Sequence, residues 1–277
     1  MTTLTDRPRE ATLNCDTRRN GQRQTVRIVT TSWDDGDPLD LQIAGLLSAH
    51  RLQGTFYIPI KGHHNLVPMN QAELRAVAAQ GFEIGAHGVS HPNLTDCEPR
   101  ELAQEVESSK KFLEDCLGAE VRAFAYPRGR YNASVISSLK RAGYLGARTT
   151  RMLAHQLTFD PFRMPTSAQV FPHSQLDYLR NIARSFYLEG SWEHSTLLRL
   201  RRTWTDLAKG LFDAVMQTGG IWHLYGHSWE IEAQGLWDSL KTVLDYVSNR
   251  EGVLYLTNSQ ALDHLPAKSP NLSPHNH

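Results

Sequence analysis

Short apolar segments alternate with longer segments of helical periodicity along most of this chain, and this alternation constrains the fold more than any other feature. The apolar segments are rich in Val, Ile, Tyr and Phe, which is typical of strands. The expected strands are 26–32, 55–60, 82–86, 123–126, 144–149, 162–166, 221–225 and 253–257. Strands separated by helices pair in parallel, so the pattern predicts an α/β fold, either a closed barrel or an open doubly wound sheet.

The helical segments have clear start and stop signals. Pro99 begins one segment and Gly118 ends it, while Asn132 can cap another that ends before Gly143. No GxGxxG follows the first strand and no GxxxxGK occurs anywhere, which removes the usual support for a nucleotide-binding open sheet. We therefore predict a distorted (β/α) barrel of about seven or eight strands.

The expected organisation is one globular domain between two polar tails. Residues 1–24 and 266–277 lack apolar periodicity, whereas residues 25–265 have the strand and helix pattern throughout. Residues 175–218 interrupt the alternation with a long helical pattern, which predicts a helical insertion before the strand at 221. The length of 277 residues suffices for a sizeable core.

Charge and hydropathy exclude several kinds of partner. Lys and Arg total 29 and Asp and Glu total 29, so no net field would attract nucleic acid. No apolar run approaches the roughly 20 residues of a membrane helix, and the first residues contain no apolar signal-peptide core. The 3 cysteines fit neither a CxxC pair nor a disulfide framework. We expect a cytoplasmic protein with no transmembrane segment. The sequence leaves open whether it forms a homo-oligomer.

Carboxylates and imidazoles follow two of the expected strands. The first strand runs into Asp34, Asp35 and Asp37, and such a group of like charges is unfavourable unless a cation is nearby. The third strand ends in an HxxxH formed by His87 and His91. On a helix or tight turn this spacing places both imidazoles on one side, and a neighbouring carboxylate would complete a metal site with open coordination positions.

Two further histidines lie on the strand near residue 221. Along an extended strand His223 and His227 would be about 13 Å apart, so they cannot occupy the same layer of a barrel. His227 comes at the strand end, where reactive groups gather in such folds. We therefore predict that His227 takes part in chemistry and that His223 is a hydrogen-bonded interior residue.

The motifs SWDDGD, HGVSH, FAYPRG and HLYGHSWE occur in this order at successive strand ends. Together they resemble the polysaccharide deacetylase family, whose NodB homology domain defines carbohydrate esterase family 4. The resemblance covers roughly residues 26–262. It implies a NodB-like barrel and a metal-dependent hydrolase.

The resemblance also implies a role for individual residues. Asp34 would be the general base, and Asp35, His87 and His91 would bind the metal. His227 would be the general acid. In the FAYPRG segment, the backbone N–H of Tyr126, next to Pro127, would help to hold the oxyanion.

Two family features are missing at their usual places. Ala125 stands where the family has an arginine that pairs with the base, and we expect Arg148 or Arg163 to replace it, since an unpaired buried carboxylate would rise in pKa. The family's Asp and Trp that orient and shield the catalytic histidine are not recognisable. Asp160 or Glu230 is expected to orient His227, and Trp229 to form a wall for the acetyl methyl group.

These inferences lead to one preferred function and two alternatives. The preferred function is removal of an N-acetyl group from an intracellular amino sugar or sugar-containing precursor, with Zn as the first choice of metal and Co, Ni or Fe as others. The first alternative is a related hydrolase acting on a formamide, a cyclic amide or an O-acetyl ester. The second is a catalytically silent carbohydrate-binding protein.

Overall fold

The computed structural model describes residues 25–62, 66–174 and 203–266 of the chain. The strands are β1 (Arg27–Asp34), β2 (Thr55–Ile58), β3 (Glu83–Ala86), β4 (Ala123–Ala125), β5 (Gly146–Arg148), β6 (Ala168–Gln169), β7 (Gly220–Gly226) and β8 (Leu254–Tyr255). The helices are α1 (Asp40–Ala49), α2 (Gln71–Ala79), α3 (Pro99–Leu117), α4 (Ala133–Arg141), α7 (Trp204–Thr218), α8 (Ser228–Gln234), α9 (Trp237–Val247) and α10 (Asn258–Leu262). Short 3-10 turns occupy η1 (Pro127–Gly129) and η2 (Pro161–Arg163).

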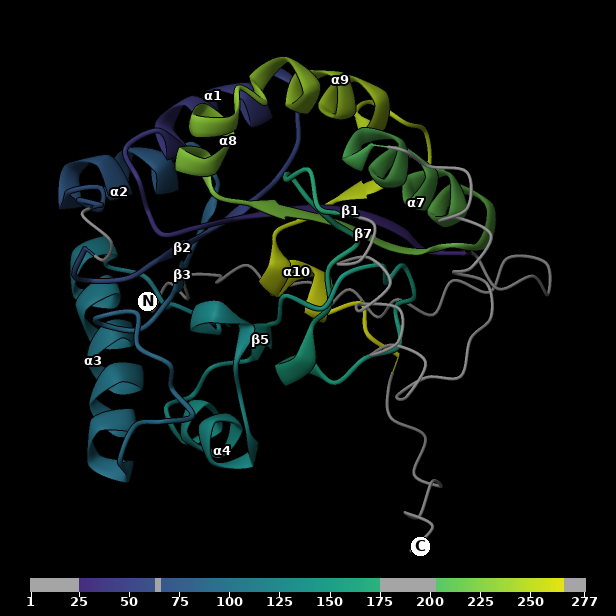
Figure 1. Ribbon diagram of the computed structural model, residues 1–277. Coiled ribbons are helices and arrows are strands. Elements are labelled where there is room, and N and C mark those ends of the chain that lie inside the picture. Colours follow the sequence, from purple (N-terminus) through teal and green to yellow (C-terminus); the bar gives the residue numbers. More distant parts are fainter. Residues whose placement is uncertain (1–24, 63–65, 175–202, 267–277) are drawn as a thin grey trace, which may run out of the picture.

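The strands form one curled parallel sheet. Their order is β5-β4-β3-β2-β1-β7-β6, and β8 pairs with the beginning of β1. An isolated parallel bridge between Arg148 and Met164 links β5 to the segment before β6. Helices α1, α7, α8 and α9 arch over one side of the β1 and β7 region (Figure 1). The predicted distorted α/β barrel is therefore confirmed, in the form of a curled half-barrel.

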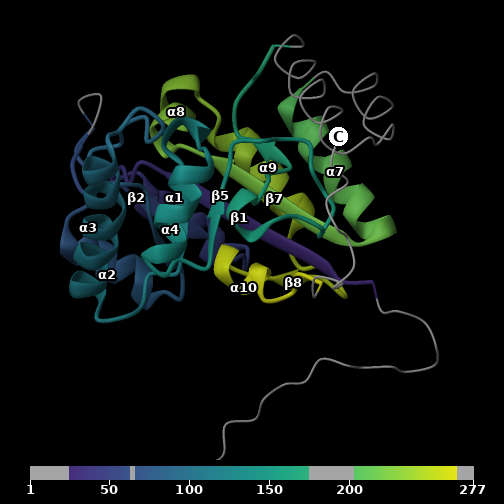
Figure 2. The ribbon, with the colours of Figure 1, turned by 90° about the horizontal axis from the view of Figure 1, so that it is seen from below.

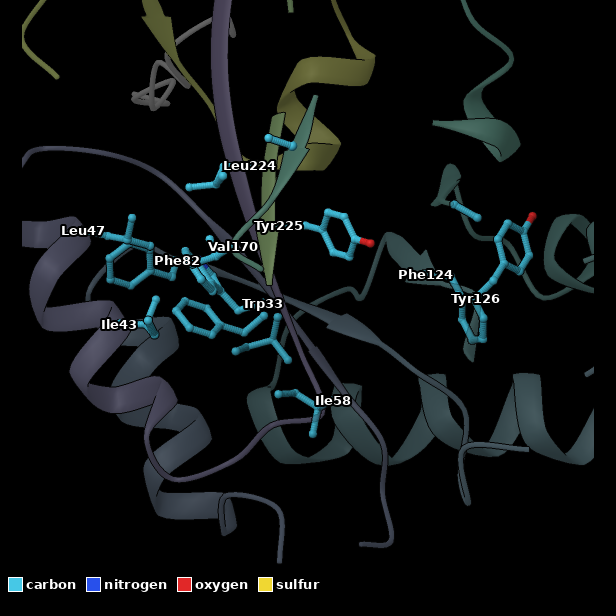
Figure 3. Packing of buried hydrophobic residues seen from close by; sticks show 14 of the residues in the cluster. Trp33, Ile43, Leu47, Ile58, Phe82, Phe124, Tyr126, Val170, Leu224 and Tyr225 are labelled. Atoms are coloured by element: carbon cyan, nitrogen blue, oxygen red, sulfur yellow. The ribbon is translucent and has the colours of Figure 1, made fainter. Parts of the chain in front are cut away.

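Alternation along β1 separates the helix-facing core from the interior of the half-barrel. Trp33 is fully buried and packs with Ile43 and Leu47 of α1 in the largest apolar cluster (Figure 3). On β7, Leu224 belongs to this side, and the ring of Tyr225 points the other way (Figure 3). The period of two thus directs the intervening polar residues into the interior of the half-barrel.

Small residues make room for large side chains in this interior. A Cβ atom on Gly85 of β3 would lie 2.5 Å from the ring of Tyr57, so only glycine permits this contact. Ala123 and Ala125 of β4 pack with the same tyrosine. The space they leave accommodates Tyr57 and, from the neighbouring strand, the fully buried side chain of Arg148.

Helix α10 closes the end of the half-barrel opposite the carboxyl ends of the strands. The side chain of Asn258 accepts a hydrogen bond from Thr30 Oγ1 at 2.8 Å and donates one to Tyr57 Oη at 2.9 Å. The helix lies across β1 from α1 and α9 (Figure 1), and the view from below shows it beside β8 (Figure 2). Access to the interior is therefore left to the carboxyl ends of the strands, where the predicted site residues follow.

Two sequence expectations differ from the structure. The strand expected at 162–166 is wrong, because η2 occupies its first part and pairing with β7 begins only at Ala168. Pro161 and Pro165 lack the N–H that a ladder requires, which explains the delay. Of the helical insertion expected at 175–218, residues 175–202 lie outside the described residues, and α7 packs against α9 and β7 as a crossover helix. No described helix combines the length and apolarity needed to cross a bilayer.

Candidate metal centre

Asp35, His87 and His91 converge at the carboxyl ends of β1 and β3. One ligand atom from each lies within 4.8 Å of the others. The Oδ1 atom of Asp35 is 3.8 Å from His87 Nε2 and 3.6 Å from His91 Nε2. Asp35 has a left-handed φ of 77°, which turns its side chain away from the direction of β1. The HxxxH forms a tight turn after β3, one of the two conformations that the spacing allowed.

The surroundings prepare these residues to hold a cation. His87 Nδ1 lies 2.8 Å from the carbonyl oxygen of Ala125, so it donates there and leaves the Nε2 lone pair facing Asp35. Burial lowers the pKa of His87, which favours the neutral, ligating form. Trp229 Nε1 donates to Asp35 Oδ2 at 3.0 Å, which leaves Oδ1 directed at the two imidazoles. Two imidazoles and a buried carboxylate fit a divalent metal.

Asp34 lies beside this group and is paired with an arginine. Nη2 of Arg148 donates to both carboxylate oxygens of Asp34. The guanidinium lies 5.4 Å from the ring centroid of Tyr57 and 4.9 Å from that of Tyr225. Burial by itself would raise the pKa of Asp34, but the charges of Arg148, His87 and His227 together outweigh burial and lower that pKa. Arg148 therefore occupies the predicted pairing position, and Arg163 is exposed on η2.

His227 faces both aspartates from the end of β7. Its Nε2 lies 3.8 Å from Asp34 Oδ2 and 3.9 Å from Asp35 Oδ2. Its Nδ1 lies 2.6 Å from Glu230 Oε2, so Glu230 is the carboxylate that orients it. Burial lowers the pKa of His227, but the bond to Glu230 and the two aspartates raise it to about 9. Asp160, the other candidate, caps η2 by accepting from Phe162 N at 2.8 Å.

Sequence reasoning missed two residues that support His227. Gln169 of β6 donates to Glu230 Oε2 at 3.3 Å and accepts from Tyr225 Oη at 2.7 Å. Asp40 accepts from Ser228 Oγ at 2.6 Å, which ties the start of α8 to α1. A polar residue at the end of a short strand is the only signal that could have identified Gln169.

The remaining predicted residues have mixed outcomes. His223 is buried between Pro165 O, 3.0 Å from its Nδ1, and Ser32 Oγ, 2.9 Å from its Nε2, which confirms its interior position. Tyr126 N donates to Arg148 O at 3.2 Å, so the predicted oxyanion donor is already used within the sheet. Pro127 is buried in η1. Trp229 lies 5.6 Å from the His227 ring, and its role as a wall for a methyl group stays a prediction.

The curled parallel sheet with an Asp-His-His group and an adjacent Asp and His defines the class of the protein: an α/β half-barrel with a candidate hydrolytic metal centre. The family model described as polysaccharide deacetylase matches residues 21–147. Over these residues the chain matches the polysaccharide deacetylase family, that is, carbohydrate esterase family 4 with its NodB homology domain.

Several relatives and solved structures are similar to this chain. It is 31% identical over 131 residues to a chitooligosaccharide deacetylase of Bradyrhizobium sp. (strain ANU 289), covering 46% of this chain and 58% of that protein. It is 30% identical over 120 residues to a peptidoglycan-N-acetylglucosamine deacetylase of Bacillus cereus, covering 43% and 54%. The chain thus spans little more than half the length of these curated relatives.

Solved structures support the fold. A crystal structure from Mycobacterium smegmatis, described as that of a polysaccharide deacetylase, superposes with a TM-score of 0.59 at 15% identity. The superposition covers 90% of this chain and 96% of that one. A CE4 family pseudoenzyme of Bacillus anthracis superposes with a TM-score of 0.52 at 15% identity, covering 87% and 67%. At these identities the likeness concerns the fold alone.

Proposed function

We propose that this chain is a metal-dependent hydrolase that removes the N-acetyl group from an amino sugar or a sugar-containing precursor. The observation that carries the proposal is the convergence of Asp35, His87 and His91 beside Asp34, a carboxylate outside that group, with His227 facing both aspartates. A divalent cation held there would polarise the acetamide carbonyl and acidify a water molecule. We favour zinc, because two imidazoles and one carboxylate are common zinc ligands, with Co, Ni and Fe as alternatives.

The roles of the two flanking residues follow from their surroundings. Asp34, held ionised by Arg148, accepts the proton of the attacking water at a carboxylate oxygen. His227, whose pKa of about 9 keeps it protonated at neutral pH, donates the Nε2 proton to the departing nitrogen. The C–N bond breaks, and the products are acetate and a free amine.

The choice of substrate rests on the relatives. Two are named as deacetylases of chitooligosaccharide and of peptidoglycan N-acetylglucosamine, which supports an N-acetylated carbohydrate here. An O-acetyl ester, a formamide or a cyclic amide would use the same groups. The structural neighbour described as a pseudoenzyme makes a silent carbohydrate-binding protein the second candidate. The cytoplasmic location, the oligomeric state and the domain limits stay predictions.

The test is acetate release from N-acetylated sugars and oligosaccharides by zinc-loaded protein. Asp34→Asn keeps the shape of the side chain and removes the base, and we expect kcat to fall by about 10²- to 10⁴-fold. Asp37→Asn is the matched control, because Asp37 lies in the same loop but accepts a bond from Leu39 N at 2.9 Å. Release that persists in Asp34→Asn would reject the assigned base. Zinc and glycan binding without release from any substrate would favour the silent alternative.

A further inference from the structure

Glu105 is a buried carboxylate on the mostly apolar inner face of α3. Its exposed fraction is 7%, and its neighbours on that face include Leu102 and Val106. Charged side chains occupy such positions only when they have strong partners, because burial removes their hydration. The partners of Glu105 therefore indicate why the sheet-facing side of this helix tolerates a charge.

Among the described residues, the hydrogen bonds of Glu105 all come from the turn of the HxxxH. Oε2 accepts from Val89 N at 2.6 Å and from Ser90 N at 3.0 Å. Oε1 accepts from Ser90 Oγ at 2.6 Å. Both residues lie between the two predicted ligands His87 and His91, so one carboxylate holds the middle of the turn that presents both imidazoles.

This turn needs such an acceptor because its backbone is neither strand nor helix. Gly88 has a φ of 80° and His91 a φ of 56°, and a left-handed conformation is unfavourable for a residue with a side chain. The carbonyl oxygens of Gly88 and Val89 accept from Ile60 N at 3.3 Å and Lys61 N at 2.7 Å. The N–H groups of Val89 and Ser90 have no neighbouring strand to pair with in the part of the chain that the structure describes. Glu105 accepts their hydrogen bonds instead.

The approach of the carboxylate also explains the glycine in the turn. A Cβ atom on Gly88 would lie 3.0 Å from Glu105 Oε2, the closest contact it would make. The sequence HGVSH and a glutamate on the following helix are therefore parts of one arrangement. Neither feature alone identifies it, since the glutamate is 14 positions beyond His91 in sequence.

We propose that Glu105 is a positioning residue of the metal centre, which acts through the hydrogen bonds of Val89 and Ser90 to set the separation of the two imidazoles. This inference rests on the proposed metal site, because its consequence is the affinity for the metal. It makes hydrogen-bond acceptance the essential property of Glu105. The charge of the side chain is secondary.

Two variants of Glu105 separate these properties. Glu105→Gln removes the charge, but its amide oxygen can accept the two backbone N–H groups while its NH₂ donates to Ser90 Oγ. Glu105→Leu introduces an apolar side chain of similar size and leaves both amides without an acceptor. Glu107→Leu is the matched control, because Glu107 is exposed on the same helix.

The first measurement is zinc affinity of the full chain by calorimetric titration with zinc alone. We expect Glu105→Leu to weaken binding by roughly 10- to 100-fold, the usual effect of losing an outer partner of a metal ligand. Glu105→Gln and Glu107→Leu should bind zinc as tightly as the original chain, without a loss of that size. Equal losses in the Gln and Leu variants, or no loss in the Leu variant, would overturn the proposal.

The second measurement is amide hydrogen exchange at Val89 and Ser90 in the metal-free protein. Both amides should be protected in the original chain and in Glu105→Gln, and should lose protection in Glu105→Leu. Unchanged protection in Glu105→Leu would refute the role of Glu105, whether or not the original chain binds zinc. Absence of zinc binding by the original chain would instead reject the proposed function.

A milder variant guards against a Glu105→Leu protein that fails to fold. Ser90 is exposed, so Ser90→Ala removes one of the three bonds without disturbing the core. We expect a smaller loss of zinc affinity than the 10- to 100-fold range, of roughly threefold. The proposal would be contradicted if Ser90→Ala kept its zinc affinity while Glu105→Gln lost zinc affinity and kept full amide protection. That combination would show that the charge of Glu105 matters and its hydrogen bonds do not.

Discussion

Replacement of Arg148 by Met should destabilise the fold and impair Asp34, and an arginine at position 125 should restore both. Arg148 of β5 and Ala125 of β4 are register partners in parallel strands, so their side chains point to the same face. Adjacent strands are only about 4.8 Å apart, which is less than the length of an arginine side chain. The variant Ala125→Arg with Arg148→Ala therefore moves the guanidinium by one strand and keeps it within reach of Asp34.

The size of the effect follows from the burial of the pair. The side chain of Asp34 is 4% exposed and that of Arg148 is 0% exposed. Removing one partner of such a buried ion pair costs about 3–5 kcal/mol, because the other charge stays buried without compensation. This is a large share of a typical net stability of about 5–15 kcal/mol. The pKa of Asp34 should rise, because Arg148 is the strongest of the charges that offset its burial.

Urea unfolding and the pH dependence of acetate release measure the two consequences. Arg148→Met should unfold at a lower urea concentration and lose activity at neutral pH, and Arg163→Met, which changes an exposed arginine, should do neither. The double variant Asp34→Asn with Arg148→Met should be more stable than Arg148→Met alone. Wild-type stability of Arg148→Met would refute the reasoning, as would a double variant no more stable than the single one.

Three further outcomes are expected. Trp229→Phe keeps an aromatic ring but removes the N–H that donates to Asp35, so zinc affinity measured by calorimetry should fall by roughly tenfold or more. The control Trp237→Phe loses an exposed bond to Glu232 and should leave the zinc affinity unchanged. Burial lowers the pKa of His223 from 6.5 to about 3, so the unfolded chain binds a proton first and stability should fall from about pH 6.5 towards pH 3, by up to about 1.4 kcal/mol per pH unit. Urea unfolding of His223→Gln should show a shallower decline over this range, and an equal decline would contradict the assignment. Zinc at about 100 times its Kd should stabilise the protein by about 2.7 kcal/mol, reversibly with a chelator, and no shift in thermal unfolding would contradict a folded-state site.

Much of the site could be predicted because its chemistry is local to strand ends. Asp34 and Asp35 follow β1 directly, and His87 and His91 follow β3, so parallel pairing alone brings them to one edge. The distance along β7 also separated His223 from the chemistry at His227. These inferences need only the positions of the strands and the rise per residue, which short apolar segments specify well.

The parts that could not be predicted depend on side-chain reach or on breaks in regular structure. Arg148 and Arg163 both come from expected strands, and only the turn η2 shows that Arg163 is exposed. That turn also displaced the expected sixth strand, since prolines lack the amide that pairing requires. The N–H of Tyr126 is engaged by Arg148 O, which extends the pairing of β4 with β5 by one residue.

Glu105 illustrates a different limit of sequence reasoning. A charged residue in the apolar stripe of α3 is visible in the sequence, but helical periodicity describes only which face is buried. Its partners on the HxxxH turn are set by how α3 packs on the end of β3, which no local pattern specifies. Gln169 is similar, because its bond to Glu230 joins β6 to α8.

The location of a bound metal ion tests the central claim most directly. Crystals of the protein soaked with zinc should show one anomalous diffraction peak at the zinc edge, at about 2.0–2.2 Å from Asp35 Oδ1 and from Nε2 of both His87 and His91. The peak should disappear when Asp35→Ala protein is treated in the same way. Zinc bound elsewhere, or no peak between these three residues in a fully loaded crystal, would contradict the account.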